Sequence, residues 1–315
     1  MKTVLKVLVK VFKNSYGEIR CGWPILVGLA AMVFFVPNLE YWVTLPFGGS
    51  NNALASLLID RAMLIGSIFL IFWLFYKRPI KRMGFYTKGW LPQMAFGLAF
   101  GAASITLVIA VLLVLGTAKI SPFSAAGFGM RAFWFGLLQF VCVGFWEEII
   151  SRGFLMTALK TTRIKIVIVL FSAAFFSLIH YMNGNVTVYS LINIALIGVL
   201  FSFMLIKTGR IWAPIGFHIA WNIVQGYILG VSVSGSPTPD SALFKVMFTG
   251  SNWLTGGAFG AEGGVACTLV VLLGMLFVHF VLKPPKNPQE FWSMDGDLPL
   301  TRTQVQREKL GNAAS

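Results

Sequence analysis

Long apolar runs alternate with short polar segments along most of the chain. Each run is close to the roughly 20 residues that an α-helix needs to cross a 30 Å hydrocarbon core. Because no water is available there to bond the backbone, such runs must be helical. The runs lie at about 22–43, 54–76, 94–116, 131–158, 164–182, 187–206, 211–231 and 264–282. The pattern predicts an all-α fold: a polytopic membrane helix bundle of about eight transmembrane helices.

Basic residues fall mainly in every second segment between the apolar runs. Of the 25 Lys and Arg residues, 20 lie in segments that would share one side of the membrane, three on the other side, and two within runs. Lys and Arg concentrate in the cytoplasmic loops of membrane proteins. The asymmetry predicts cytoplasmic N- and C-termini and a multi-pass protein of the cell membrane, expected to be a bacterial inner membrane.

The composition narrows the class of protein. Hydrophobic residues make up 57% of the chain and charged residues 11%, against roughly 25% charged in a soluble domain. This excludes a water-soluble globular fold. The net charge of +14 comes from bases dispersed among short loops, so we expect no nucleic-acid partner. The three cysteines, Cys21, Cys142 and Cys267, are too few and too irregularly spaced for a disulfide framework.

The two ends and one loop differ from the rest of the chain. Residues 1–20 carry regularly spaced lysines opposite apolar positions, which predicts a basic amphipathic helix on anionic lipids at the membrane surface. Residues 21–283 would form the transmembrane bundle, and the polar residues 284–315 a flexible cytoplasmic tail. The predicted outer loop, about 232–263, is rich in Gly, Ser and Pro, and we expect its segment 249–264 to pack back onto the bundle.

Charged side chains inside the apolar runs are the strongest sign of function, since each costs about 2.5–3.5 kcal/mol at the membrane centre. Asp60 and Arg61 are neighbours that point about 100° apart, so we expect a structural role without mutual pairing. Glu148 and Arg152 are four residues apart with the acid first, the favourable order for an ion pair. Glu147 is rotated by about 100° from Glu148, so Arg152 cannot easily neutralise both carboxylates. Glu147 is then left without a cationic partner, which suits a general base. An interfacial charge cluster is the alternative interpretation.

Two of the three histidines also lie in apolar runs with polar neighbours. His180 follows Phe176 by one helical turn, and His218 precedes Asn222 by one turn. Polar groups that face lipid are costly, so these side chains should face the interior that Glu147 also faces. His279 has no polar companion, and we expect it to be structural.

Helix geometry raises one difficulty for a shared site. At 1.5 Å per residue along straight helices, Glu147 lies about 16 Å from the cytoplasmic end of its run, His218 about 10 Å and His180 about 24 Å. These depths agree better if the fifth helix begins later than its apolar run, and we expect it to begin near Ile168.

The three motifs together resemble a known family. Glu-Glu-x-x-x-Arg at 147–152, Phe-x-x-x-His at 176–180 and His-x-x-x-Asn at 218–222 occur in this order in the CAAX-protease and bacteriocin-processing family, also called the abortive-infection family. It includes the type II CAAX prenyl endopeptidases, and the resemblance covers about residues 90–285. It implies an intramembrane endopeptidase in which Glu147 activates water beside His180, His218 and Asn222 stabilise the oxyanion, and Glu148 and Arg152 orient the site.

The resemblance leaves the cofactor open. Two histidines and a glutamate form a recognisable catalytic zinc set, and Glu147, His180 and His218 would be the ligands. The chain has no His-Glu-x-x-His helix, however, and a glutamate-type mechanism without metal is also proposed for the family. The expected partner is a peptide or membrane-protein substrate, either a prenylated CAAX-like tail or a leader peptide, and its identity stays open.

Two other functions compete with the protease. A catalytically idle scaffold or immunity protein would not need all six motif residues, which are intact here. A proton-coupled transporter could use the same buried acids and histidines as a relay. The chain lacks the internal repeat on which many transporter folds are built.

Overall fold

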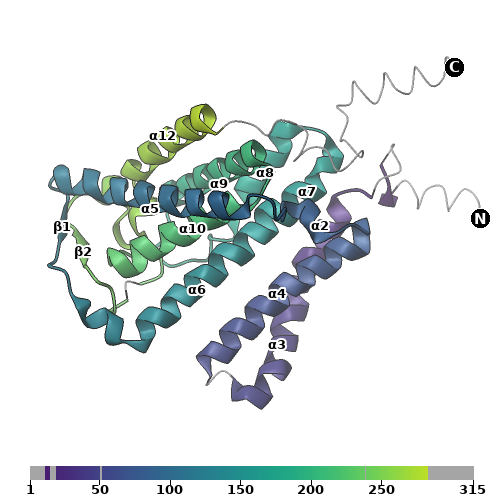
Figure 1. The fold of residues 1–315 in the computed structure, drawn as a ribbon, viewed down its shortest axis with the longest axis horizontal. Coiled ribbons are helices and arrows are strands. Elements are labelled where there is room, and N and C mark those ends of the chain that lie inside the picture. Colours follow the sequence, from purple (N-terminus) through teal and green to yellow (C-terminus); the bar gives the residue numbers. More distant parts are fainter. Residues whose placement is uncertain (1–10, 15–18, 50–51, 238, 283–315) are drawn as a thin grey trace, which may run out of the picture.

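The computed structural model describes residues 11–14, 19–49, 52–237 and 239–282. Most of the predicted interfacial helix of residues 1–20 and the whole predicted tail of residues 284–315 lie outside the described residues. Nearly all regular structure in the described part is helical (Figure 1).

The helices follow the predicted apolar runs closely. The α-helices are α2 (Gly22–Ala30), α3 (Val36–Thr44), α4 (Ala53–Tyr76), α5 (Trp90–Val114), α6 (Arg131–Glu148), α7 (Met156–Leu159), α8 (Lys165–Leu178), α9 (Val188–Thr208), α10 (Trp212–Ile223), α11 (Asn252–Thr255) and α12 (Val265–Val281). The π-helical segments are η1 (Ala31–Phe35), η6 (Ile149–Leu155) and η8 (Val224–Ile228). The 3₁₀ turns are η2 (Leu45–Phe47), η4 (Ile80–Met83), η5 (Ala125–Gly129), η7 (Lys160–Thr162), η9 (Gly257–Phe259) and η10 (Ala261–Gly263).

Five continuous helical stretches are long and apolar enough to cross a membrane. They are Gly22–Phe47, Ala53–Tyr76, Trp90–Val114, Arg131–Thr162 and Val188–Thr208. Two further apolar helices, α8 and α12, are shorter. The chain is thus a multi-pass, predominantly helical membrane protein.

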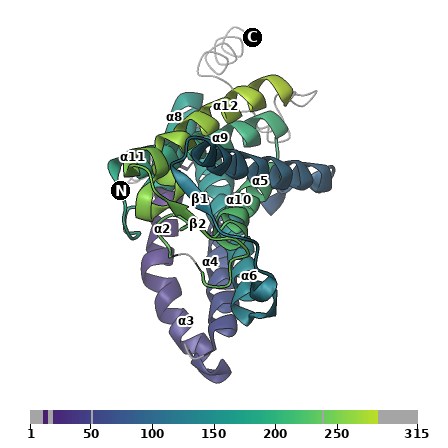
Figure 2. The ribbon, with the colours of Figure 1, turned by 90° about the vertical axis from the view of Figure 1, so that its left-hand side faces the viewer.

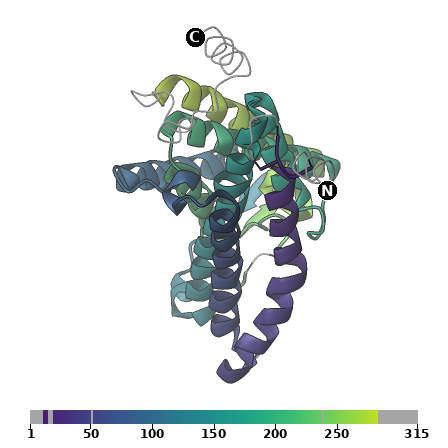
Figure 3. The same cartoon turned by 90° about the vertical axis from the view of Figure 1, so that its right-hand side faces the viewer.

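The structure also contains a small sheet that the sequence did not predict. Strand β1 (Ala118–Ile120) pairs antiparallel with β2 (Val246–Phe248), with Lys119 opposite Met247. Figure 1 shows this sheet at one end of the molecule, where it joins the loop after α5 to the long loop before α12, and in Figure 2 that end faces the viewer. In Figure 3, α2–α3 and α4 form a pair of helices that extends away from the main bundle.

The bundle is packed most closely between α5 and α10. A Cβ atom at Gly97 or Gly101 would overlap the backbone of Ala213 or Phe217 on the facing helix. Such small residues, four apart, let two membrane helices approach along their backbones. They pack α10, which carries His218 and Asn222, against the rest of the bundle.

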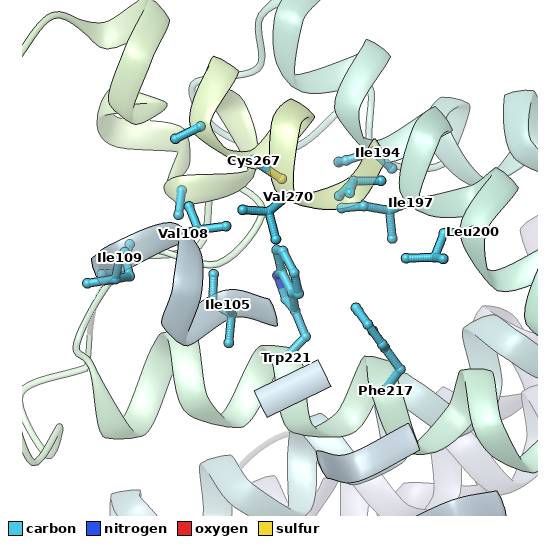
Figure 4. Close-up of a cluster of buried hydrophobic side chains, with 14 of the residues drawn as sticks. Ile105, Val108, Ile109, Ile194, Ile197, Leu200, Phe217, Trp221, Cys267 and Val270 are labelled. Carbon is cyan, nitrogen blue, oxygen red and sulfur yellow. The ribbon is translucent and has the colours of Figure 1, made fainter. Parts of the chain in front are cut away.

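The largest hydrophobic cluster lies where α5, α9, α10 and α12 meet (Figure 4). Trp221 and Phe217 of α10 enter it from one side, and Ile105 of α5 and Ile197 of α9 pack around them. Cys267 of α12 is buried in the same cluster and, like Cys21 and Cys142, forms no disulfide. One face of α10 is therefore fixed in the core, which leaves another for polar residues.

Two expectations about the helices are wrong. Helix α8 begins at Lys165, not near Ile168, and it ends at Leu178 before His180 is reached. The depth estimate failed because it assumed straight, parallel helices, whereas α6 slants across α5 in Figure 1 and continues through π-helical η6.

Asp60 and Arg61 do pair with each other, with Nη1 2.6 Å from Oδ2, because the long arginine side chain reaches back along the helix.

Candidate active site

The predicted site residues gather around one cavity of about 150 Å³. Helices α6, α8, α9 and α10 form its walls, and segments of the loops after α8 and before α12 complete them. Among the lining residues are Glu147, His180, His218 and Asn222, which come from three different segments of the chain. The inward-facing arrangement expected for these four side chains is therefore present.

Glu147 faces both histidines. Its Oε2 lies 3.7 Å from His180 Nε2 and 3.9 Å from His218 Nε2. The side chain is nearly buried, and Oε2 has no hydrogen-bond partner among the described residues. One carboxylate oxygen and two imidazole nitrogens, each from a separate segment of the chain, therefore converge on one small volume.

The hydrogen bonds of the two rings determine which of their nitrogens carries a proton. His180 Nδ1 lies 2.7 Å from the Phe176 carbonyl, which can only accept, so Nδ1 is the donor. His218 Nδ1 lies 3.2 Å from Glu148 Oε1, which likewise accepts from it. In each neutral ring the Nε2 lone pair is then directed toward Glu147. A carboxylate and two lone pairs all accept hydrogen bonds, so the group that suits this volume is a donor such as water.

The predicted ion pair lies behind the cavity wall. Arg152 Nη1 is 3.0 Å from Glu148 Oε1, and both side chains are completely buried. Arg152 also donates to the Gly198 carbonyl, and its guanidinium lies over the ring of Phe176 at 4.1 Å. Glu148 therefore holds two partners, Arg152 on its own helix and His218 on α10. Neither member of the ion pair lines the cavity, which suits the orienting role that the resemblance implies.

His279 lies apart from this cavity, near the end of α12. Its backbone carbonyl accepts a hydrogen bond from Lys207, and its ring packs against Phe280. This agrees with the structural role expected from the sequence.

Sequence reasoning missed one buried acid, Glu262 in η10. Its Oε2 accepts hydrogen bonds from the Ser234 backbone N–H at 2.6 Å and hydroxyl at 3.0 Å. Its Oε1 accepts one from Trp221 Nε1 at 3.1 Å. The backbone carbonyl of Glu262 also accepts from Asn193 of α9, at 2.7 Å. The available signal was a single carboxylate in a glycine-rich segment that was already expected to pack back onto the bundle.

Burial raises the pKa of the Glu262 carboxyl above its ordinary 4.5, while the Ser234 and Trp221 hydrogen bonds and the nearby His180 oppose the shift. Glu262 lines the same cavity as Glu147. The cavity thus contains two acids and two histidines, and none of its lining residues is Lys or Arg.

The comparisons with known proteins bear on this part of the chain. Residues 129–224 match the family model of the type II CAAX prenyl endopeptidase Rce1-like proteins. Residues 129–224 are an Rce1-like domain. The Rce1-like domain contains all six motif residues from Glu147 to Asn222, and its family is one of membrane proteases. Comparison with curated proteins and with solved structures finds no match. Glu262 lies beyond the end of the Rce1-like domain.

The distances at Glu147 bear on the open question of a metal. No three His, Cys, Asp or Glu side chains of the described residues are placed to hold one ion. With zinc bonds of about 2.0–2.1 Å, the separations of 3.7 and 3.9 Å would require angles of about 130° and about 145°, against about 109° in a tetrahedral site. The geometry around Glu147 fits a hydrogen-bonded water better than a zinc ion.

Proposed function

We propose that this chain is an intramembrane endopeptidase that hydrolyses a peptide bond with a water molecule activated by Glu147. The observation that carries the proposal is the convergence of Glu147 Oε2 with two histidine Nε2 atoms in a cavity inside the bundle. The activity of the Rce1-like family supports it. Intact motif residues argue against an idle scaffold, and the missing internal repeat argues against a transporter.

In the proposed reaction, a water molecule lies between Glu147 and His180. Glu147 takes a proton from it as the oxygen attacks the peptide carbonyl carbon, and His180 orients the water through Nε2. The carbonyl π electrons move onto oxygen, which becomes the oxyanion of a tetrahedral intermediate. The Asn222 amide donates a hydrogen bond to this oxyanion, and so does His218 Nε2 when the ring has taken up a second proton at that nitrogen before the attack. The intermediate then collapses, the carbon–nitrogen bond breaks, and the proton held by Glu147 passes to the departing amine.

Glu148 and Arg152 act as positioning residues in this proposal. Glu148 accepts a hydrogen bond from His218 Nδ1–H and thereby directs Nε2 into the cavity. Arg152 neutralises the buried Glu148 charge and holds that carboxylate in place. No step of the mechanism uses a metal, because the distances at Glu147 do not fit one.

We also propose a topology of eight crossings with both termini in the cytoplasm. Besides the five long stretches, α8, α12 and the continuous helix α10–η8 would each cross or nearly cross the bilayer. The distribution of Lys and Arg supports this orientation. The protease core would then extend from about residue 90 to 285, as the resemblance implies.

The test uses the full-length protein, purified in detergent, and a library of quenched fluorescent peptides. Wild type is compared with Glu147→Gln and His180→Ala. Loss of a general base typically lowers the rate by 10²–10⁴-fold, so we expect almost no cleavage by Glu147→Gln. Asp240→Asn, in the exposed part of the outer loop, is the matched control and should cleave like wild type. Equal cleavage by all four proteins would show that another group performs the chemistry.

A further inference from the structure

Most of the residues that line the cavity are displaced toward one end of the helices. On α6 they are Gln139, Phe140 and Val143, which precede Glu147 in the direction of Arg131. On α10, which runs the opposite way, they follow His218 in the direction of η8. The two antiparallel helices therefore place the space beside Glu147 at the same end of the bundle.

The loops that complete the cavity belong to this end too. Asn183 comes from the turn after α8, Ser234 and Ser236 follow η8, and Glu262 precedes α12. Ser236 lines the cavity and is also exposed, so the cavity reaches the surface at this loop. Helix α8 ends at Leu178, before His180, and its shortness leaves room for these loops beside the site.

The opposite end of the bundle carries the basic residues. Ten described Lys and Arg residues lie in the segments that join α4 to α5, α6 to α8 and α9 to α10, or at the adjoining helix ends: Lys77, Arg78, Lys81, Arg82, Lys88, Lys160, Arg163, Lys165, Lys207 and Arg210. At the end with the cavity mouth, the described segments hold only Lys119, Arg131 and Lys245. Since basic loops stay in the cytoplasm, the mouth faces the other side of the membrane.

Charge inside the cavity bears on which part of a peptide can bind. Its lining has two carboxyl groups, Glu147 and Glu262, and no Lys or Arg. A free C-terminal carboxylate three residues beyond the cleaved bond would lie within about 10 Å of that bond, close to both acids. At that range, in a medium less polar than water, an ionised Glu147 repels a second carboxylate appreciably. The aromatic rings of Phe140, Phe176 and Trp221 instead offer contacts for an apolar side chain.

We propose that the substrate is an internal, uncharged or basic peptide segment presented on the non-cytoplasmic side of the membrane. The inference rests on the proposed protease function, and it departs from a cytoplasmic tail that ends in a free carboxylate. An exported polypeptide, or the outer flank of a membrane-anchored one, has this character.

The side of the mouth can be tested without any substrate. Ser236→Cys is made in a chain whose Cys21, Cys142 and Cys267 are replaced by serine or alanine, with Lys88→Cys at the basic end as the matched control. A membrane-impermeant maleimide should label Ser236→Cys in right-side-out vesicles and Lys88→Cys in inside-out vesicles only. Labelling of Ser236→Cys in inside-out vesicles alone would overturn the proposal. If the cysteine-free chain does not fold, the same substitutions in the wild-type chain, read as labelling above wild type, answer the same question.

The preferred end group is tested with purified wild-type protein. A peptide that the library identifies as cleaved is made in two forms, with a free acid or an amide three residues after the cleaved bond. We expect kcat/KM for the amide to be at least about fivefold higher, from repulsion of the acid by Glu147. A preference for the free acid would overturn the proposed substrate class. Failure of the protease function itself would appear separately, as equal cleavage by Glu147→Gln, and would leave the labelling result intact.

Discussion

The buried Glu148–Arg152 pair allows stability and site geometry to be tested separately. Both side chains are completely buried, and the guanidinium is fixed between Glu148, the Gly198 carbonyl and the Phe176 and Phe201 rings. Glu148→Met leaves that charge without its partner, which costs about 3–5 kcal/mol. We expect the melting temperature to fall by roughly 6–15 °C.

The double variant Glu148→Met/Arg152→Met gives the opposite expectation for stability. Replacing a buried ion pair by apolar residues of similar volume is often neutral or stabilising, so most of the lost stability should return. Cleavage should not return with it, because His218 Nδ1 has lost the carboxylate that directs its ring. The measurement is thermal unfolding in detergent beside the rate of peptide cleavage.

The control for these variants is Asp60→Asn, which breaks a partly exposed ion pair outside the cavity lining and should change both quantities little. The reasoning would be refuted if Glu148→Met melted like wild type. It would also be refuted if the double variant cleaved peptide at the wild-type rate.

Four further results are expected. Glu262→Ala leaves the Trp221 and Ser234 N–H groups without acceptors, which should lower the free energy of unfolding by about 1–3 kcal/mol for each group and slow cleavage at least tenfold. Asp240→Ala should change neither stability nor cleavage. Because burial raises the pKa of Glu262, protonation of this carboxyl stabilises the folded protein. This stabilisation is complete below pH 4.5 and is lost as the pH rises through the raised pKa. The free energy of unfolding of Glu262→Gln, measured at a series of pH values, should not show this pH-dependent contribution. The same pH profile for Glu262→Gln and wild type would contradict the assignment. Gly101→Ala should destabilise the protein by about 1–3 kcal/mol by overlap with Phe217, while Gly66→Ala, in open space on α4, should be neutral or stabilising in thermal unfolding. A strong chelator should leave the cleavage rate of wild type unchanged, and loss of activity restored by added zinc would show that a metal is bound at Glu147, His180 and His218.

The sequence predicted the helices because membrane segments must be both apolar and long, and both properties are visible residue by residue. It also predicted the Glu148–Arg152 pair, since four residues correspond to about one helical turn. The shared position of Glu147, His180 and His218 followed from the cost of facing polar groups to lipid. These inferences depend on local spacing or on the membrane as a solvent, and a single chain contains that information.

The sequence could not predict features that depend on how the helices meet. The slant of α6, the π-helical segment η6 and the early end of α8 bring His180 to Glu147, and none of them leaves a periodic pattern. The Asp60–Arg61 contact arises from a side-chain conformation, which spacing rules do not describe. Glu262 was missed because an acid in an irregular loop has no helical partner position, so its bonds to Trp221 and Ser234 exist only in the folded chain.

A membrane that stores an ion gradient loses energy through any continuous aqueous path across it. The cavity at Glu147 opens at one surface, and behind its wall lie Glu148 and Arg152, whose side chains have no exposed surface at all. The Phe176 and Phe201 rings enclose the guanidinium on that side. A completely buried ion pair packed against aromatic rings leaves no space for a water column on that side of the cavity. The proposed hydrolysis in mid-membrane would then not make the protein a conductor of protons.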